Sequence, residues 1–100
     1  MVKFTEEIFI MTKHYEIKVF GRVQGVGFRY AASNRARSLN LKGWVENLHD
    51  GSVRTAVQGD EDGCRTYIDW CKNGTGYSWI ERVEISEKEP ETFTSFRVRY

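Results

Sequence analysis

The hydrophobic pattern of this chain changes repeatedly between the period of a strand and the period of a helix. Residues 13–20 alternate apolar and polar side chains, which is typical of a strand with one buried face. Residues 28–39 instead repeat apolar side chains at spacings of three and four, which predicts a helix. Further changes of this pattern predict, in chain order, strands over 41–48 and 53–58, a helix from Asp60 to Asn73, a strand over 80–86 and a last strand over 96–100.

This order of elements restricts the fold strongly. It predicts a ferredoxin-like α+β sandwich, β-α-β-β-α-β, with two helices packed on one face of an antiparallel sheet. A chain of 100 residues buries roughly 60 to 70 per cent of its unfolded surface, which is enough for one core. We therefore expect one domain over residues 13–100. Residues 1–12 are expected to form a poorly ordered N-terminal extension, in which Met11 is an alternative start.

Charge and hydropathy exclude several classes of partner. The 15 Lys and Arg residues nearly balance the 14 Asp and Glu residues, so a net charge of +1 provides no long-range attraction to nucleic acid or to an anionic membrane. No apolar run approaches the roughly 18 to 20 residues of a membrane span, and the first residues do not resemble a signal peptide. We expect a cytoplasmic monomer with no nucleic-acid or membrane partner.

The two cysteines are expected to be reduced core thiols. Cys64 and Cys71 lie on one face of a predicted helix but about 10 Å apart along its axis, too far for a mutual disulfide. A metal site or a nucleophile is the alternative, but neither cysteine has a His or Asp at ligand spacing. No metal and no cofactor are expected.

The segment GRVQGVGFRY, residues 21–30, joins the first strand to the first helix. Glycines at such a junction allow successive backbone N–H groups to converge on one anion, and the helix N-terminus adds further donors. Arg29 follows with a planar fork of donors that suits two phosphate oxygens. A tight turn beside a solvated arginine is the alternative. The GxxxGxG spacing matches neither a Walker loop nor a dinucleotide-binding fingerprint.

The segment KGWVENLHDGSV, residues 42–53, contains the second candidate side chain. In the expected topology the strand of Asn47 lies next to the first strand, which brings Asn47 near the helix of Arg29. A side-chain amide has a donor and an acceptor and can hold a water molecule in a set orientation. The alternative is that Asn47 only ends a strand before an Asp-Gly turn.

These segments together resemble the acylphosphatase family. The resemblance rests on GRVQGVGFR, GWVEN, DGSV, VQG and the terminal FRVRY, and it extends from about Tyr15 to Tyr100. It implies a metal-free hydrolase that cleaves small acyl phosphates into a carboxylate and inorganic phosphate. In that family's pattern Arg29 would bind the phosphate and Asn47 would orient the water. The phosphate-binding residues implied by the resemblance are Val23, Gln24, Gly25, Val26, Gly27, Phe28 and Arg29.

Two departures from the family's pattern and two rival functions remain, and the added N-terminal residues are the first of these departures. Family members often have a proline-containing turn after the second helix, whereas this chain has NGTGYSWIE over residues 73–81. An RNA-binding module shares the same order of elements, and residues 42–45 begin like its aromatic motif, but the motif fails at Glu46 and the chain has no basic excess. A non-catalytic regulatory module of the same fold is the other alternative.

Overall fold

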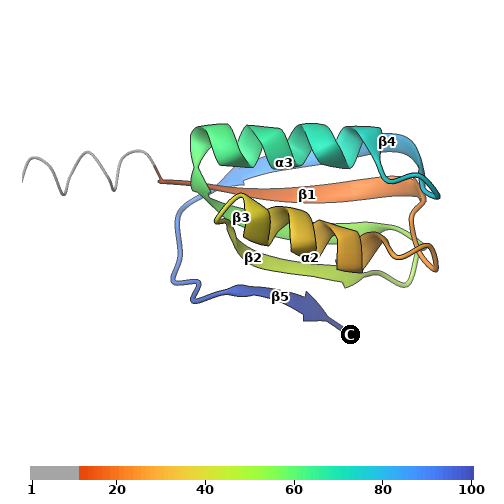
Figure 1. Ribbon diagram of the computed structural model, residues 1–100, viewed down its shortest axis with the longest axis horizontal. Coiled ribbons are helices and arrows are strands. Elements are labelled where there is room, and N and C mark those ends of the chain that lie inside the picture. The colour runs from red at the N-terminus through yellow and green to blue at the C-terminus, as the bar shows by residue number, and fades with distance from the viewer. Residues whose placement is uncertain (1–11) are drawn as a thin grey trace, which may run out of the picture.

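The computed structural model describes residues 12–100, and its elements follow the order expected from the sequence (Figure 1). The expected N-terminal extension, apart from its last residue, lies outside the described residues. The elements are β1 (Thr12–Arg22), α2 (Phe28–Ser38), β2 (Lys42–Asn47), β3 (Val53–Asp60), α3 (Glu61–Asn73), β4 (Trp79–Lys88) and β5 (Phe96–Arg99).

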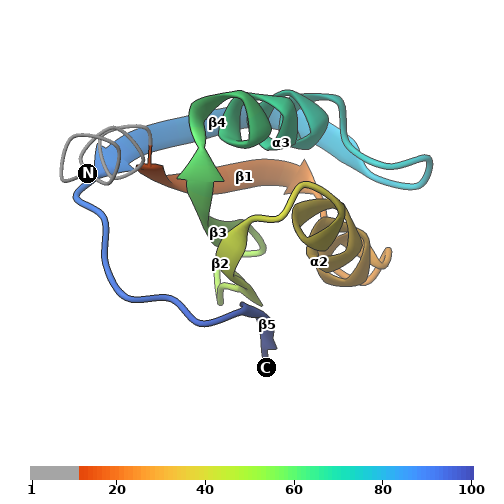
Figure 2. The ribbon, with the colours of Figure 1, turned by 60° about the vertical axis from the view of Figure 1, so that its left-hand side comes forward.

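The strands form one sheet in the order β4-β1-β3-β2-β5. β1 pairs antiparallel with β3 and β4, and β2 pairs antiparallel with β3. β5 instead lies parallel to β2, because the chain leaves β4 at one edge and passes to the opposite edge before β5 begins (Figure 2). The ferredoxin-like sandwich is confirmed, but the sheet is mixed and not wholly antiparallel.

The strand order expected from the sequence is wrong in one respect. β3 lies between β1 and β2, so the strand that ends at Asn47 does not touch the first strand. The connection through α2 places β2 one strand away from β1. The position between them is occupied by β3, the second strand of the β2–β3 hairpin. A direct β1–β2 pairing therefore cannot explain how Asn47 approaches the glycine loop.

Both helices pack on the same face of the sheet, and the core lies between these two layers (Figures 1 and 2). Asp60 caps α3 by accepting a hydrogen bond from the N–H of Gly63, as its position before the helix predicted. The core consists of Ile17, Val19, Val23, Phe28, Ala32, Ala36, Leu41, Val45, Val53, Val57, Cys64, Tyr67, Ile68, Cys71 and Phe96.

The cysteines belong to this core. Cys64 and Cys71 are buried and free, as expected. Burial raises the pKa of the Cys64 thiol to about 11 and raises the pKa of Cys71 further. Neither thiol is therefore activated as a nucleophile at neutral pH.

Candidate active site

The loop between β1 and α2 has the backbone that its glycines suggest. Gly25 and Gly27 have φ angles of 74° and 79°, in the left-handed region that side chains disfavour. A Cβ at either position would meet no heavy atom within 4 Å, so these glycines serve the backbone conformation and not close packing. Such left-handed turns allow neighbouring N–H groups to point toward one anion.

Gly21 has a different task. Its φ angle is 136°, and a Cβ there would collide with the backbone carbonyl of Trp79. The β1–β4 pairing also shifts register between Phe20 and Gly21. This glycine lets β4 approach the end of β1, so it belongs to the sheet and not to the anion-binding loop.

The N-terminus of α2 opens onto the loop without a side-chain cap. Gly27 is the N-cap residue, it makes no side-chain capping bond, and the first turn contains no acidic residue. The first N–H groups of a helix have no partner within the helix, and they lie at the positive end of its dipole. This end of α2 is therefore suited to a negatively charged ligand.

Arg29 lies in the first turn of α2 and is held by the end of β5. Its Nη1 donates to the carbonyl oxygen of Arg99 at 3.1 Å. Its guanidinium carbon lies 4.8 Å from the centroid of the Tyr100 ring, within range of a cation–π contact. These contacts restrict the guanidinium while most of its five N–H donors remain available to a ligand.

Asn47 is the last residue of β2 and pairs with Val53 of β3. Its side-chain oxygen Oδ1 is buried and has no hydrogen-bond partner among the described residues. Buried carbonyl oxygens are nearly always paired, so an unpaired one in a pocket is suited to accept a hydrogen bond from a ligand or a bound water.

One pocket of about 170 Å³ brings these groups together. Arg29 and Asn47 both line it. Of the remaining candidate residues, Gln24 and Val26 do not line it: the Gln24 side chain bonds to the β2–β3 turn, and Val26 packs against the core. The lining residues are Val23, Gly25, Gly27, Phe28, Arg29, Tyr30, Asn47, Val98 and Tyr100.

Three of these lining residues were not expected from the sequence. Tyr30 follows Arg29 on α2, and Val98 and Tyr100 come from the end of the chain. The alternation of residues 96–100 places Val98 and Tyr100 on one face of a strand, so the sequence does indicate that these two side chains point the same way. It does not say which strand lies beside them, so their place in the pocket follows only from the parallel β2–β5 pairing.

The described residues form neither a metal cluster nor a membrane-spanning helix. Within residues 12–100, no three side chains of His, Cys, Asp or Glu gather where they could hold a metal ion. No helix in the part of the chain that the structure describes has the length and apolarity needed to span a bilayer.

The protein is a two-layer α+β domain in which a glycine loop, an open helix N-terminus, an arginine and an amide surround one pocket. These features define a class of proteins that are equipped to bind a phosphate group. Comparison with known proteins makes this class specific. The family model described as acylphosphatase matches residues 15–98, and the chain belongs to the acylphosphatase family.

Individual relatives agree over most of their length. The chain is 42% identical to the acylphosphatase of Thermococcus kodakarensis over 82 residues, which cover 82% of this chain and 90% of that protein. The crystal structure of acylphosphatase from Bacillus subtilis shares 36% identity with a TM-score of 0.85, covering 88% of this chain and 99% of the other. An acylphosphatase structure from Coxiella burnetii shares 32% identity with a TM-score of 0.87, covering 90% and 95%.

Proposed function

We propose that this chain is an acylphosphatase, a hydrolase that cleaves acyl phosphates into a carboxylate and inorganic phosphate, with Arg29 and Asn47 as its catalytic residues. Membership of the family supports the activity. The observation that supports these two residues is that both line one pocket beside the glycine loop.

The phosphate group of the substrate sits in the loop. Backbone N–H groups of residues 23–28 and the N-terminus of α2 contact its oxygens, and Arg29 binds two oxygens through its fork. Phosphoryl transfer requires mainly positioning and stabilisation of charge on the equatorial oxygens, which these donors supply without a metal or cofactor.

Asn47 aims the attacking water. Its unpaired Oδ1 accepts a hydrogen bond from the water and turns a lone pair of the water oxygen toward phosphorus. The amide is a weak base, so a phosphate oxygen of the substrate takes the proton. The leaving carboxylate has a conjugate acid with a pKa of about 4, so it departs without a protein acid.

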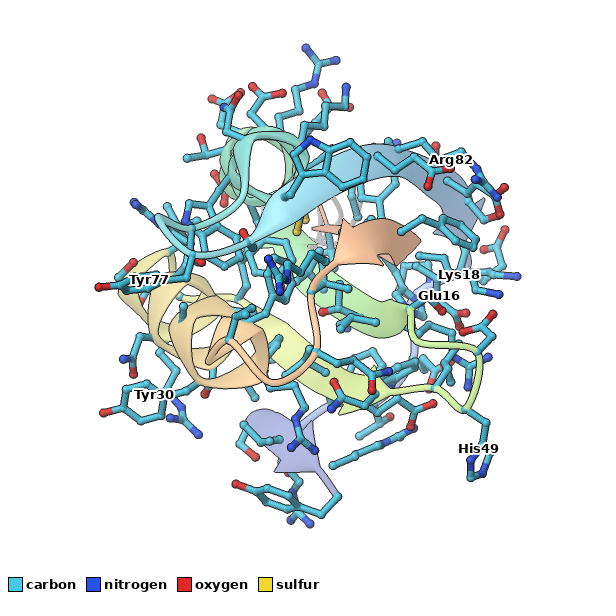
Figure 3. The ribbon with its side chains drawn as sticks, turned by 90° about the vertical axis from the view of Figure 1, so that its right-hand side faces the viewer. Glu16, Lys18, Tyr30, His49, Tyr77 and Arg82 are labelled. Atoms are coloured by element: carbon cyan, nitrogen blue, oxygen red, sulfur yellow. The ribbon has the colours of Figure 1, made fainter. Side chains whose placement is uncertain are left out.

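We also propose that the protein is a cytoplasmic monomer that binds a small acyl phosphate and does not bind nucleic acid. An RNA-binding sheet stacks bases on exposed aromatic rings. Here cations cover two rings on the face of the sheet opposite the helices: Arg54 and Arg99 lie 5.2 Å and 4.1 Å from the Trp44 ring, and Arg82 lies 3.8 Å from the Phe20 ring. Figure 3 shows Arg82 on this side of the sheet, away from the helices. These contacts cover the faces of the two rings on which bases would stack, which disfavours RNA binding.

Phosphate release from benzoyl phosphate, measured with a chelator present, tests the proposal. The parent chain is expected to release phosphate, and Asn47→Ala is expected to lower kcat by about 100-fold because the water loses its orientation. The inhibition constant of inorganic phosphate should hardly change in that variant. No release by the parent chain would refute the activity, and a parent-like kcat of Asn47→Ala would remove Asn47 from the mechanism.

A further inference from the structure

The two halves of the candidate site come from elements that do not touch within the sheet. β1 leads into the glycine loop, β2 ends at Asn47, and β3 separates these strands. The strand ladder therefore connects the loop to Asn47 only through a third strand. The position of a catalytic water relative to the phosphate must be accurate to a fraction of an ångström. A direct contact between the loop and the residues next to Asn47 would help to fix that position.

The side chain of Gln24 makes that shorter connection. Its Nε2 donates to the carbonyl oxygen of Leu48 at 2.7 Å and to that of Ser52 at 2.8 Å. Leu48 directly follows Asn47, and Ser52 directly precedes Val53, the partner of Asn47 in the ladder. The two N–H groups of one amide thus hold both sides of the turn next to Asn47.

The two carbonyl oxygens also accept hydrogen bonds within the turn. Leu48 donates through its N–H to the Ser52 oxygen at 2.9 Å, and Gly51 donates to the Leu48 oxygen at 3.2 Å. A carbonyl oxygen has two lone pairs, so Gln24 supplies the second donor to each. Its amide completes the hydrogen bonding of the turn and at the same time ties it to the glycine loop.

The far side of the turn is held independently. Asp50 forms an ion pair with Lys18 of β1 at 3.0 Å and accepts hydrogen bonds from the N–H and the hydroxyl of Ser52. The hydrogen bonds from Ser52, followed by the contact with Lys18, hold the pKa of Asp50 below its ordinary value. The turn therefore keeps its own shape, and the contribution of Gln24 is its placement against the loop.

We propose that Gln24 is a positioning residue, whose side-chain amide fixes Asn47 relative to the phosphate-binding loop through Leu48 and Ser52. The inference rests on the proposed function. Gln24 acts on the water through Asn47 and leaves the loop glycines and Arg29 in place. Its removal should slow the chemical step and leave phosphate binding largely intact.

Gln24→Met tests this role, because methionine has a similar length and no N–H donor. We expect kcat for benzoyl phosphate to fall roughly 10- to 100-fold, while the inhibition constant of inorganic phosphate changes less than about 3-fold. A purely structural role would not produce this division between kcat and phosphate binding.

Gln58→Met is a matched control. Gln58 also bridges backbone groups, because its Nε2 donates to the Glu91 oxygen at 2.7 Å and its Oε1 accepts from the Glu91 N–H at 2.9 Å. It lies at the opposite end of β3 from Val53. The substitution should lower the urea midpoint of unfolding, as the loss of two hydrogen bonds would, with kcat unchanged.

A double variant gives the decisive measurement. If Gln24 acts through Asn47, then Gln24→Met should lower kcat less than about 2-fold in the Asn47→Ala background. An equal factor in both backgrounds, or weaker phosphate binding with unchanged kcat, would overturn the positioning role while the hydrolase proposal stands. A parent chain that released no phosphate from benzoyl phosphate would overturn both.

Discussion

At the scale of single residues, the proposed mechanism depends on the shape of one cation. Arg29 is restrained by the Arg99 carbonyl oxygen and by the ring of Tyr100. Its remaining N–H donors lie in the fixed plane of the guanidinium, where two of them match two oxygens of one phosphate. A lysine at this position keeps the charge but has a single, strongly hydrated ammonium group.

Arg29→Lys is therefore expected to lower kcat/KM for benzoyl phosphate by about 100-fold or more, because the charge developing on the phosphate loses its paired donors. Steady-state kinetics measure this. Arg37→Lys is the control, since Arg37 lies on the same helix and donates through Nη2 to the Phe96 oxygen of β5 at 3.0 Å, outside the pocket. A parent-like turnover of Arg29→Lys would exclude the bidentate contact.

The loop shows which residue-level features are readable in a sequence. Gly25 and Gly27 have left-handed backbones with open space beside them, as a glycine-rich strand-to-helix junction suggested. Gly21 was indistinguishable from them in the sequence. Its task depends on the close approach of Trp79 from β4, a contact between segments far apart in the chain that no local pattern encodes.

At the scale of elements, local signals determined the helices and non-local pairing determined the last strand. Asp60 and Gly74 lie at the two ends of α3, so the bounds of that helix were predictable from capping chemistry. The strand character of residues 96–100 was also predictable. Its partner and its parallel direction were not, because they depend on the path of residues 89–95 around the sheet.

That strand supplies a wall of the pocket, and Tyr100→Leu tests its contribution. Loss of the cation–π contact with Arg29 should raise KM roughly 2- to 5-fold. The fold should persist, because Tyr100 is fully exposed. Tyr77→Leu, which alters another exposed tyrosine outside the pocket, should leave KM unchanged. An unchanged KM in Tyr100→Leu would show that the ring does not restrain Arg29.

A buried hydrogen-bond chain joins α3 to the sheet. Thr55 Oγ1 donates to the Trp44 carbonyl oxygen at 2.8 Å, so it accepts from the hydroxyl of Tyr67, also at 2.8 Å. Thr55→Val keeps the shape of the side chain but removes its hydrogen bonds to the Tyr67 hydroxyl and the Trp44 carbonyl oxygen. This loss should cost about 1 to 3 kcal/mol of unfolding free energy. Urea denaturation measures the loss.

A substitution at Tyr67 separates the contribution of packing from that of hydrogen bonding. Tyr67→Phe removes one donor and keeps the ring, so it should cost about 1 kcal/mol. The double variant Thr55→Val/Tyr67→Phe should lose less than the sum of the two single variants, because no phenolic hydroxyl then remains unpaired. Strictly additive losses would show that the hydroxyl finds another partner and that the chain of bonds is not a unit.

At the scale of the whole molecule, the core contains three groups that become charged only by losing a proton. Burial raises the pKa of Tyr67 well above its ordinary value of 10.0, and it raises those of Cys71 and Cys64 above 9.0. In the unfolded chain these groups titrate near their ordinary values. Above about pH 9 the unfolded state therefore holds fewer protons than the folded state, and rising pH favours unfolding.

The urea midpoint should consequently stay level near neutral pH and fall as the pH rises above about 9. Cys71, which is almost completely buried, should account for up to about 1.4 kcal/mol per pH unit in that range. Cys71→Ala should lower the midpoint at pH 7 by creating a cavity, yet flatten its decline at alkaline pH. Tyr77→Phe, which alters an exposed phenol, should leave the decline as it is. If the decline were equally steep in Cys71→Ala, Cys71 would not contribute to the alkaline loss of stability, since its thiol would no longer be there to ionise on unfolding.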